Sequence, residues 1–165
     1  MRKILAFSAF AAIATAIPAG AQPAAGMSAF DYYVGAWTCA GGPTSRPPAQ
    51  NVSFTATMDG GVLRELVSVP VQGDIKTPIS VSMAISYDGK GHYVQTQQDS
   101  FGFWEVSSAP TWTGNTEEWT DLAISDGKLG HGQKLRADRD HFTSTGYGPT
   151  GATPTFKASC QRRSS

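Results

Sequence analysis

The sequence predicts an all-β protein whose strands form a closed, antiparallel, up-and-down barrel of about ten strands. Its 165 residues suffice for one compact domain and include 18 glycines and 10 prolines. Short runs of alternating apolar and polar residues recur between turn residues, with the spacing of about 8–12 residues found in sandwiches and barrels. Two cysteines, Cys39 and Cys160, lie near the two ends of this series of strands. Their placement favours a barrel.

The N-terminal segment is predicted to be a targeting signal. Arg2 and Lys3 are followed by an uncharged apolar stretch over 4–17 and by a small-x-small sequence, Ala-Gly-Ala, over 19–21. These features are typical of a secretory signal peptide over 1–21. The apolar stretch is shorter than the roughly 20 residues that span a bilayer.

The remaining chain is predicted to be an exported, mildly acidic domain. Removing residues 1–21 leaves 144 residues with 11 basic and 13 acidic side chains, a net charge of −2. Residues 22–27 show no periodicity and are predicted to be a disordered leader, so the domain takes up 28–163. No basic stripe is present, and we expect no nucleic-acid partner. No later stretch is apolar for long enough to span a membrane, so we expect a periplasmic or secreted protein.

The domain is predicted to open with a short helical turn over 28–32, capped by Ser28, and to continue as strands. The clearest alternation runs over 79–87, where large apolar residues alternate with serine and alanine. An Asp-Gly-Gly sequence over 59–61 is typical of a tight hairpin turn. The predicted strands are 34–40, 51–58, 62–69, 79–87, 92–98, 101–107, 117–125, 129–137, 141–147 and 155–161.

The two cysteines help to choose between a barrel and a sandwich. Export would place Cys39 and Cys160 in an oxidising compartment, where a disulfide is expected. That bond needs Cα atoms within about 7 Å. The first and last strands of a meander become neighbours only if the sheet closes, whereas a sandwich brings them together only in particular topologies. We expect a structural bridge because the chain has no CxxC motif and no third cysteine.

Several segments resemble lipocalins and their calycin relatives. Gly35-Ala36-Trp37, within the opening segment 30–38, is similar to the Gly-x-Trp signature of the first lipocalin strand. More specifically, residues 28–162 resemble a lipocalin-like family of secreted bacterial proteins of unknown function. The shared segments are YVGAW at 33–37, MDGG at 58–61, YDGKGHYV at 87–94 and WTGNTEEW at 112–119.

This resemblance implies a barrel with a lumen for one small ligand. It implies that Trp37 closes one end and that an arginine packs on its ring through a cation–π contact; the candidates are Arg136, Arg162 and Arg163. The haem-binding nitrobindins share the barrel but usually continue from the tryptophan into a Gly-rich run. Here the continuation is TCAGG over 38–42, which departs from that pattern, and no cofactor is predicted.

Polar residues that alternate with apolar neighbours are the candidate lumen contacts. A carboxylate or imidazole in an apolar lumen has a perturbed pKa and can serve as an acid, a base or a ligand anchor. The alternative is that these side chains face solvent, because a one-residue slip moves every side chain to the other face. The polar candidates are Glu65, Glu105, Asp121, His131 and Gln133.

Aromatic residues complete the candidate sets, although most aromatic residues in strands are used for packing. The three histidines have neither HxH nor HExxH spacing, and no metal site is predicted. The candidate ligand-binding residues are Trp37, Glu65, Phe103, Glu105, Trp119, His131 and Gln133. The candidate catalytic residues are Glu65, Asp121 and His131.

Three functions remain open from the sequence. The leading hypothesis is an exported protein that binds a small hydrophobic or aromatic molecule in its lumen. The alternative is a small enzyme, such as an isomerase, cyclase, lyase or hydrolase, with acid and base residues in the same cavity. That alternative needs at least two of the three catalytic candidates in one pocket. The third is an envelope structural or interaction protein, which predicts a packed interior and an exposed apolar patch.

Overall fold

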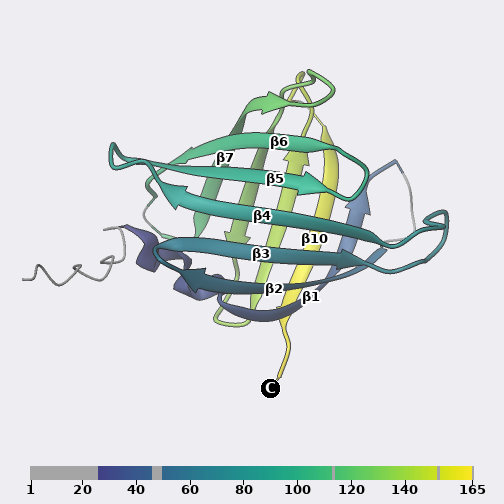
Figure 1. The fold of residues 1–165 in the computed structure, drawn as a ribbon, viewed down its shortest axis with the longest axis horizontal. Coiled ribbons are helices and arrows are strands. Elements are labelled where there is room, and N and C mark those ends of the chain that lie inside the picture. The colour runs from purple at the N-terminus through teal and green to yellow at the C-terminus, as the bar shows by residue number, and fades with distance from the viewer. Residues whose placement is uncertain (1–25, 46–49, 113, 152, 165) are drawn as a thin grey trace, which may run out of the picture.

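Ten antiparallel strands close on themselves to form one barrel, which confirms the predicted fold class. Strand β1 pairs with β2 on one side and with β10 on the other, and the remaining strands pair in sequence order. In Figure 1, strands β2–β6 form the wall nearest the viewer and β7–β10 run steeply across behind it. The strands are β1 (Gly35–Pro43), β2 (Gln50–Asp59), β3 (Val62–Val69), β4 (Ile79–Tyr87), β5 (His92–Asp99), β6 (Trp104–Pro110), β7 (Thr116–Ile124), β8 (His131–Arg136), β9 (His141–Tyr147) and β10 (Pro154–Arg162).

The computed structural model describes residues 26–45, 50–112, 114–151 and 153–164. The predicted signal peptide over 1–21 and most of the predicted leader over 22–27 lie outside the described residues. No helix among the described residues is long and apolar enough to cross a membrane.

The seam between β1 and β10 closes the barrel. Cys39 and Cys160 face each other in the antiparallel register of these strands, and a disulfide joins them with Cα atoms 4.0 Å apart. The predicted bridge is therefore confirmed, and it links residues 121 positions apart in the chain.

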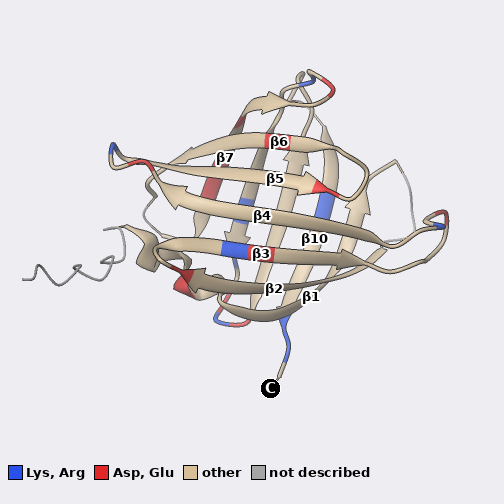
Figure 2. Cartoon of the chain, viewed as in Figure 1, with Lys and Arg blue, Asp and Glu red and all other residues tan. Residues whose placement is uncertain are grey.

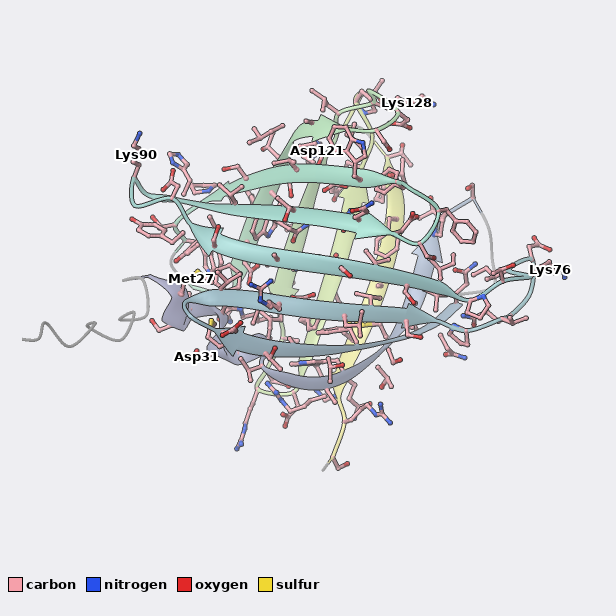
Figure 3. All side chains as sticks on the ribbon, in the orientation of Figure 1. Met27, Asp31, Lys76, Lys90, Asp121 and Lys128 are labelled. Atoms are coloured by element: carbon pink, nitrogen blue, oxygen red, sulfur yellow. A yellow bond between two sulfur atoms is a disulfide. The ribbon has the colours of Figure 1, made fainter. Side chains whose placement is uncertain are left out.

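A 3₁₀ helix, η1 (Met27–Tyr33), lies at one end of the barrel (Figure 1). Figure 3 shows Met27 at that end and Lys76 at the opposite end. The prediction of Ser28 as N-cap was wrong, because the cap residue is Gly26 and no side chain caps the helix. Met27, expected in the leader, is the first residue of η1 and is buried, since packing its side chain into the barrel end removes apolar surface from water.

Trp37 lies at the centre of this barrel end. Its indole Nε1 donates a hydrogen bond to the Tyr33 carbonyl oxygen at 2.8 Å, and its ring stacks on Phe54. Arg162 is the arginine that lies over the indole, with Cζ 4.3 Å from the ring centroid. Gly35 has a φ of 125°, and a Cβ there would lie 3.1 Å from the Arg162 guanidinium. The glycine of Gly-x-Trp is thus required by both the backbone conformation and the approach of this arginine.

One strand begins later than predicted because of a turn. Residues 101–103 belong to the β5–β6 hairpin, and β6 begins at Trp104. The Asp99 carboxylate accepts hydrogen bonds from the backbone N–H groups of Phe101 (2.8 Å) and Phe103 (2.9 Å). Such a side-chain-to-backbone turn competes with strand pairing, so the aromatic content of this segment overstated the length of the strand.

Candidate functional site

The barrel interior has two parts with different chemistry. We call the first the plugged end; it consists of η1, Trp37, Phe142 and the Glu117–Arg136 pair. We call the second the polar interior; it consists of Glu65, Gln95, Gln97, Glu105, Ser107, Asp121 and Lys134. Figure 2 shows that charged residues are sparse along the strands and more frequent in the turns, so charges inside the barrel need an explanation.

In the plugged end, the buried charge of Glu117 is fully compensated. Its Oε1 lies 2.7 Å from Nη2 and 3.1 Å from Nε of Arg136, and the Tyr33 hydroxyl donates to the same oxygen at 2.5 Å. Burial and the adjacent Glu117 carboxylate raise the pKa of Tyr33 above its usual range, so the phenol remains a donor. The Arg136 guanidinium also lies over the rings of Tyr32 and Trp112. This network holds η1 against the barrel wall.

The polar interior contains a row of three side chains on adjacent strands. Gln95 on β5 faces Ser107 on β6, and Ser107 faces Asp121 on β7. Gln95 and Ser107 are buried, yet Gln95 Oε1 and Ser107 Oγ have no hydrogen-bond partner among the described residues. Figure 3 labels Asp121, which lies well away from Met27 and the plugged end.

A register shift in the β6–β7 pair places Asp121, on the same face as Glu117 and Trp119, opposite Ser107. Val106 faces Ala123 whereas Ser107 faces Asp121, so Leu122 is an extra residue at a β-bulge. In a regular ladder Asp121 would face Ser108, on the outer side of the barrel. The bulge instead keeps the carboxylate beside Ser107 and leaves Leu122 exposed.

Glu105 lies two residues before Ser107 on the same face of β6. Gln97 Nε2 donates a hydrogen bond to Glu105 Oε2 at 2.8 Å, and Asp121 Oδ2 accepts one from the Gly130 backbone N–H at 2.7 Å. Burial and the nearby Asp121 carboxylate raise the pKa of Glu105 to about 7, against the lowering effect of the Gln97 hydrogen bond. The Ser107 hydroxyl is close enough to lower this pKa slightly, although it lacks hydrogen-bonding geometry.

Glu65 is the most deeply buried acid of the polar interior. Its side chain lies on β3 between the inward positions of Leu63 and Val67, it is 7% exposed, and its Oε1 has no hydrogen-bond partner among the described residues. Burial raises the pKa of Glu65, and the positive charge of Lys134 opposes this rise. The Lys134 ammonium lies 5.2 Å from the centroid of the Tyr33 ring, towards the plugged end.

Five of the sequence candidates lie in or beside the barrel interior. Trp37 and Trp119 are buried in the aromatic core, and Glu65, Glu105 and Asp121 face the polar interior. Phe103 is half-buried and lies in the hairpin just before β6.

The lumen-facing interpretation of His131 and Gln133 was wrong. His131 is exposed and stacks on the Tyr147 ring, and Leu135, on the same face of β8, is 45% exposed. Leu135 faces outward because the inner face of this strand carries Lys134 and Arg136, which contact the aromatic rings and Glu117. The three catalytic candidates therefore do not meet in one pocket, since His131 is outside the barrel.

The sequence reasoning missed Gln95, Ser107 and Lys134. The sequence held a signal for the first two, because Gln95 lies on the same strand face as Tyr93, and Ser107 on the same face as Ala109. Tyr93 and Ala109 are both buried. The alternation shows which face they share, but no periodicity reveals that their polar atoms lack partners.

A shallow hollow also lies on the outer wall over β3–β6. Its borders include outward-facing residues such as Arg64, Ser82 and Trp104, and also Met83, Gln97 and Glu105, whose side chains face the interior. Among the described residues, no three carboxylate, imidazole or thiol groups are close enough together to hold a metal ion. The buried atoms without hydrogen-bond partners, in contrast, belong to side chains that face the barrel interior.

Comparison with solved structures gives the same fold. The crystal structure of Rv2717c from M. tuberculosis is 15% identical, with a TM-score of 0.67 over 87% of this chain and 100% of that chain. A redesigned β-barrel is 12% identical, with a TM-score of 0.46 over 81% of this chain and 94% of that chain. No protein-family profile matches the chain, and no curated protein sequence matches it. The first likeness supports the barrel fold alone.

Proposed function

We propose that this protein binds a small molecule inside its barrel. The observation that carries the proposal is the group of three buried atoms without hydrogen-bond partners: Glu65 Oε1, Gln95 Oε1 and Ser107 Oγ. Leaving a buried polar group unpaired costs about 1–3 kcal/mol. A ligand that hydrogen-bonds to these atoms recovers that free energy on binding, which gives it both affinity and orientation.

The apolar lining suits a ligand that is largely apolar with one polar end. Val52, Val67 and Ala158 pack against the core from three different strands and are only partly buried. A hydrophobic or aromatic body would cover these side chains, while its polar group meets the unpartnered atoms. Pockets for small molecules commonly combine an apolar lining with a few convergent polar groups in this way.

A lipocalin-like relationship and an exported location belong to the same proposal. The Arg162–Trp37 contact behind the Gly-x-Trp sequence supports the first. The Cys39–Cys160 disulfide and the signal-peptide-like N-terminus support the second, since disulfides persist in oxidising compartments.

The test is a matched pair of variants at adjacent positions. Ser107→Leu fills the interior, and Ser108→Leu places the same group on the outer face of β6. Native mass spectrometry and solvent extraction should find a co-purifying small molecule with wild type and Ser108→Leu, and much less with folded Ser107→Leu. Equal recovery from both variants would overturn the proposal, as would an interior satisfied by ordered water alone with no ligand recovered.

Acid–base catalysis in the same interior is a second candidate, and one observation favours it. Glu105, with a pKa of about 7, lies beside Asp121, and a carboxyl group that titrates near neutral pH can act as a general acid or base. A probe is 5-nitrobenzisoxazole: a carboxylate removes its C–H proton, the electron pair forms the nitrile, and the N–O bond breaks to release a phenolate. We expect turnover that rises through pH 7 and is lost in Glu105→Gln. Unchanged turnover in that variant would reject this candidate.

A further inference from the structure

The polar interior holds more acid than base. The acids Glu65, Glu105 and Asp121 face this interior. Lys134 faces it as well, and its positive charge favours the ionised form of Glu65. The other inward pair, Glu117 with Arg136, is already neutralised internally. Among the described residues, none of the three acids takes part in an ion pair. Burial then raises the pKa of Glu65 and of Glu105; the Lys134 charge opposes this rise at Glu65, whereas the Asp121 carboxylate adds to it at Glu105.

Two neutral side chains beside these acids have an oxygen atom that receives no hydrogen bond. Gln95 Oε1 is an acceptor, and the Ser107 hydroxyl can accept as well as donate. Both are more than nine-tenths buried, and both share one cross-strand row with Asp121. A ligand that fits here needs several N–H or O–H donors on one small group.

From this arrangement we propose that the ligand is a small organic amine, bound as its ammonium ion, with an apolar or aromatic body. This inference rests on the proposed binding function. The ammonium lies against Gln95, Ser107 and Asp121, with Glu105 adjacent. An ammonium carries three donors and a positive charge, and it therefore donates to Gln95 Oε1, Ser107 Oγ and Asp121 while its charge offsets those of the Asp121 and Glu105 carboxylates.

The position of Lys134 fixes the orientation of the ligand. Its ammonium lies over the Tyr33 and Trp119 rings, towards the plugged end. A ligand ammonium at the Ser107–Asp121 side avoids that like charge, and its apolar body then extends towards Val67 and Met83 on β3 and β4. An anionic ligand in the same position would face Glu105 and Asp121, and a purely apolar ligand would leave the buried acceptors unpaired.

The test compares three probes of one shape and three charges: 2-naphthylmethylamine, 2-naphthylmethanol and 2-naphthoate. Isothermal titration at pH 8, where the amine is charged and Glu105 is largely ionised, measures each dissociation constant. We expect the amine to bind at least about tenfold more tightly than the alcohol and the naphthoate not to bind measurably. Quenching of tryptophan fluorescence gives a second readout, since Trp119 faces the interior.

Matched acid-to-amide variants assign the effect to the interior. Glu105→Gln and Asp121→Asn should reduce the preference for the amine over the alcohol to about threefold or less, while leaving the affinity for the alcohol within twofold. Glu118→Gln removes one acid from the outer face of β7 and should retain the full preference. If Glu118→Gln loses the preference equally, net charge alone explains it and the inference fails.

The remaining outcomes separate this inference from the binding function. Binding of the alcohol or the naphthoate as tightly as the amine overturns the amine inference and leaves the binding function standing. If no probe binds, the extracted ligand of the wild-type protein decides. A non-amine ligand overturns the inference alone, an amine supports it, and an empty extract overturns both.

Discussion

The plugged end and the polar interior bury charge in opposite ways. In the plugged end, Glu117 is completely buried, and Arg136, Tyr33 and the Trp119 indole all donate to it. In the polar interior, Glu65 is nearly as deeply buried and its Oε1 has no partner among the described residues. Buried polar groups that serve the fold are normally paired, and Glu65 departs from this rule. The same barrel thus holds one end where buried charge is paired and one region where buried polar atoms lack partners among the described residues.

The largest expected effect concerns the disulfide beside the plugged end. Cys39 and Cys160 lie two residues from Trp37 and Arg162, which face each other in the same register. Replacing both cysteines with alanine should lower the free energy of unfolding by up to about 4–5 kcal/mol, because the bond closes a loop of 121 residues. Urea unfolding measures the loss, and far-UV circular dichroism should show the fold unchanged. A loss below about 1 kcal/mol would show that non-covalent contacts hold the seam.

Arg136→Met should be the next most damaging change. It leaves the Glu117 carboxylate buried without its counter-ion, which costs about 3–5 kcal/mol in typical buried pairs. Chemical denaturation at pH 7 measures the change. The double variant Glu117→Leu/Arg136→Met removes both charges and should recover part of the loss. A double variant no better than the single one would contradict the ion-pair explanation.

Glu65→Leu tests the polar interior and should have the opposite sign. It removes a buried carboxylate that has no hydrogen-bond partner for one oxygen, and it should raise the free energy of unfolding by about 1–2 kcal/mol. The same denaturation experiment measures the gain. Destabilisation by more than about 1 kcal/mol would show that Glu65 supports the fold, and the contrast between the two regions would fail. Stabilisation by a change that also weakens ligand binding is the expected pattern for a functional site.

The contrast between the two regions also explains which features the sequence could predict. Alternation identified the strands, and the positions of Cys39 and Cys160 predicted closure, because both depend on patterns along the chain. Alternation failed on β8, where Leu135 suggested the inner face but Lys134 occupies it. The rule that apolar residues face inward does not hold where the interior itself is charged.

The register shift at Leu122 lies beyond any pattern in the sequence. It brings Asp121 beside Ser107, and it depends on how β6 and β7 pair in space. The compensation of Glu117 by Arg136 likewise depends on the pairing of two strands that brings together residues 19 positions apart in the chain. Candidate acids could therefore be named from the sequence, but whether each is paired or unpaired required the structure.

The smallest expected effect is a dependence of stability on pH that arises from Glu105. Its pKa is about 7 in the folded protein and near 4.5 in the unfolded chain, so between these values the folded state binds more protons than the unfolded state. The free energy of unfolding should therefore fall as pH rises from about 4.5 to 7, and remain lower above pH 7. Glu105 is only partly buried, and screening by solvent limits the change to about 1 kcal/mol. Subtracting the denaturation profile of Glu105→Gln from that of wild type isolates this contribution from other titrating groups. A flat difference profile would show that Glu105 has an ordinary pKa, and that solvent or a counter-charge already compensates it.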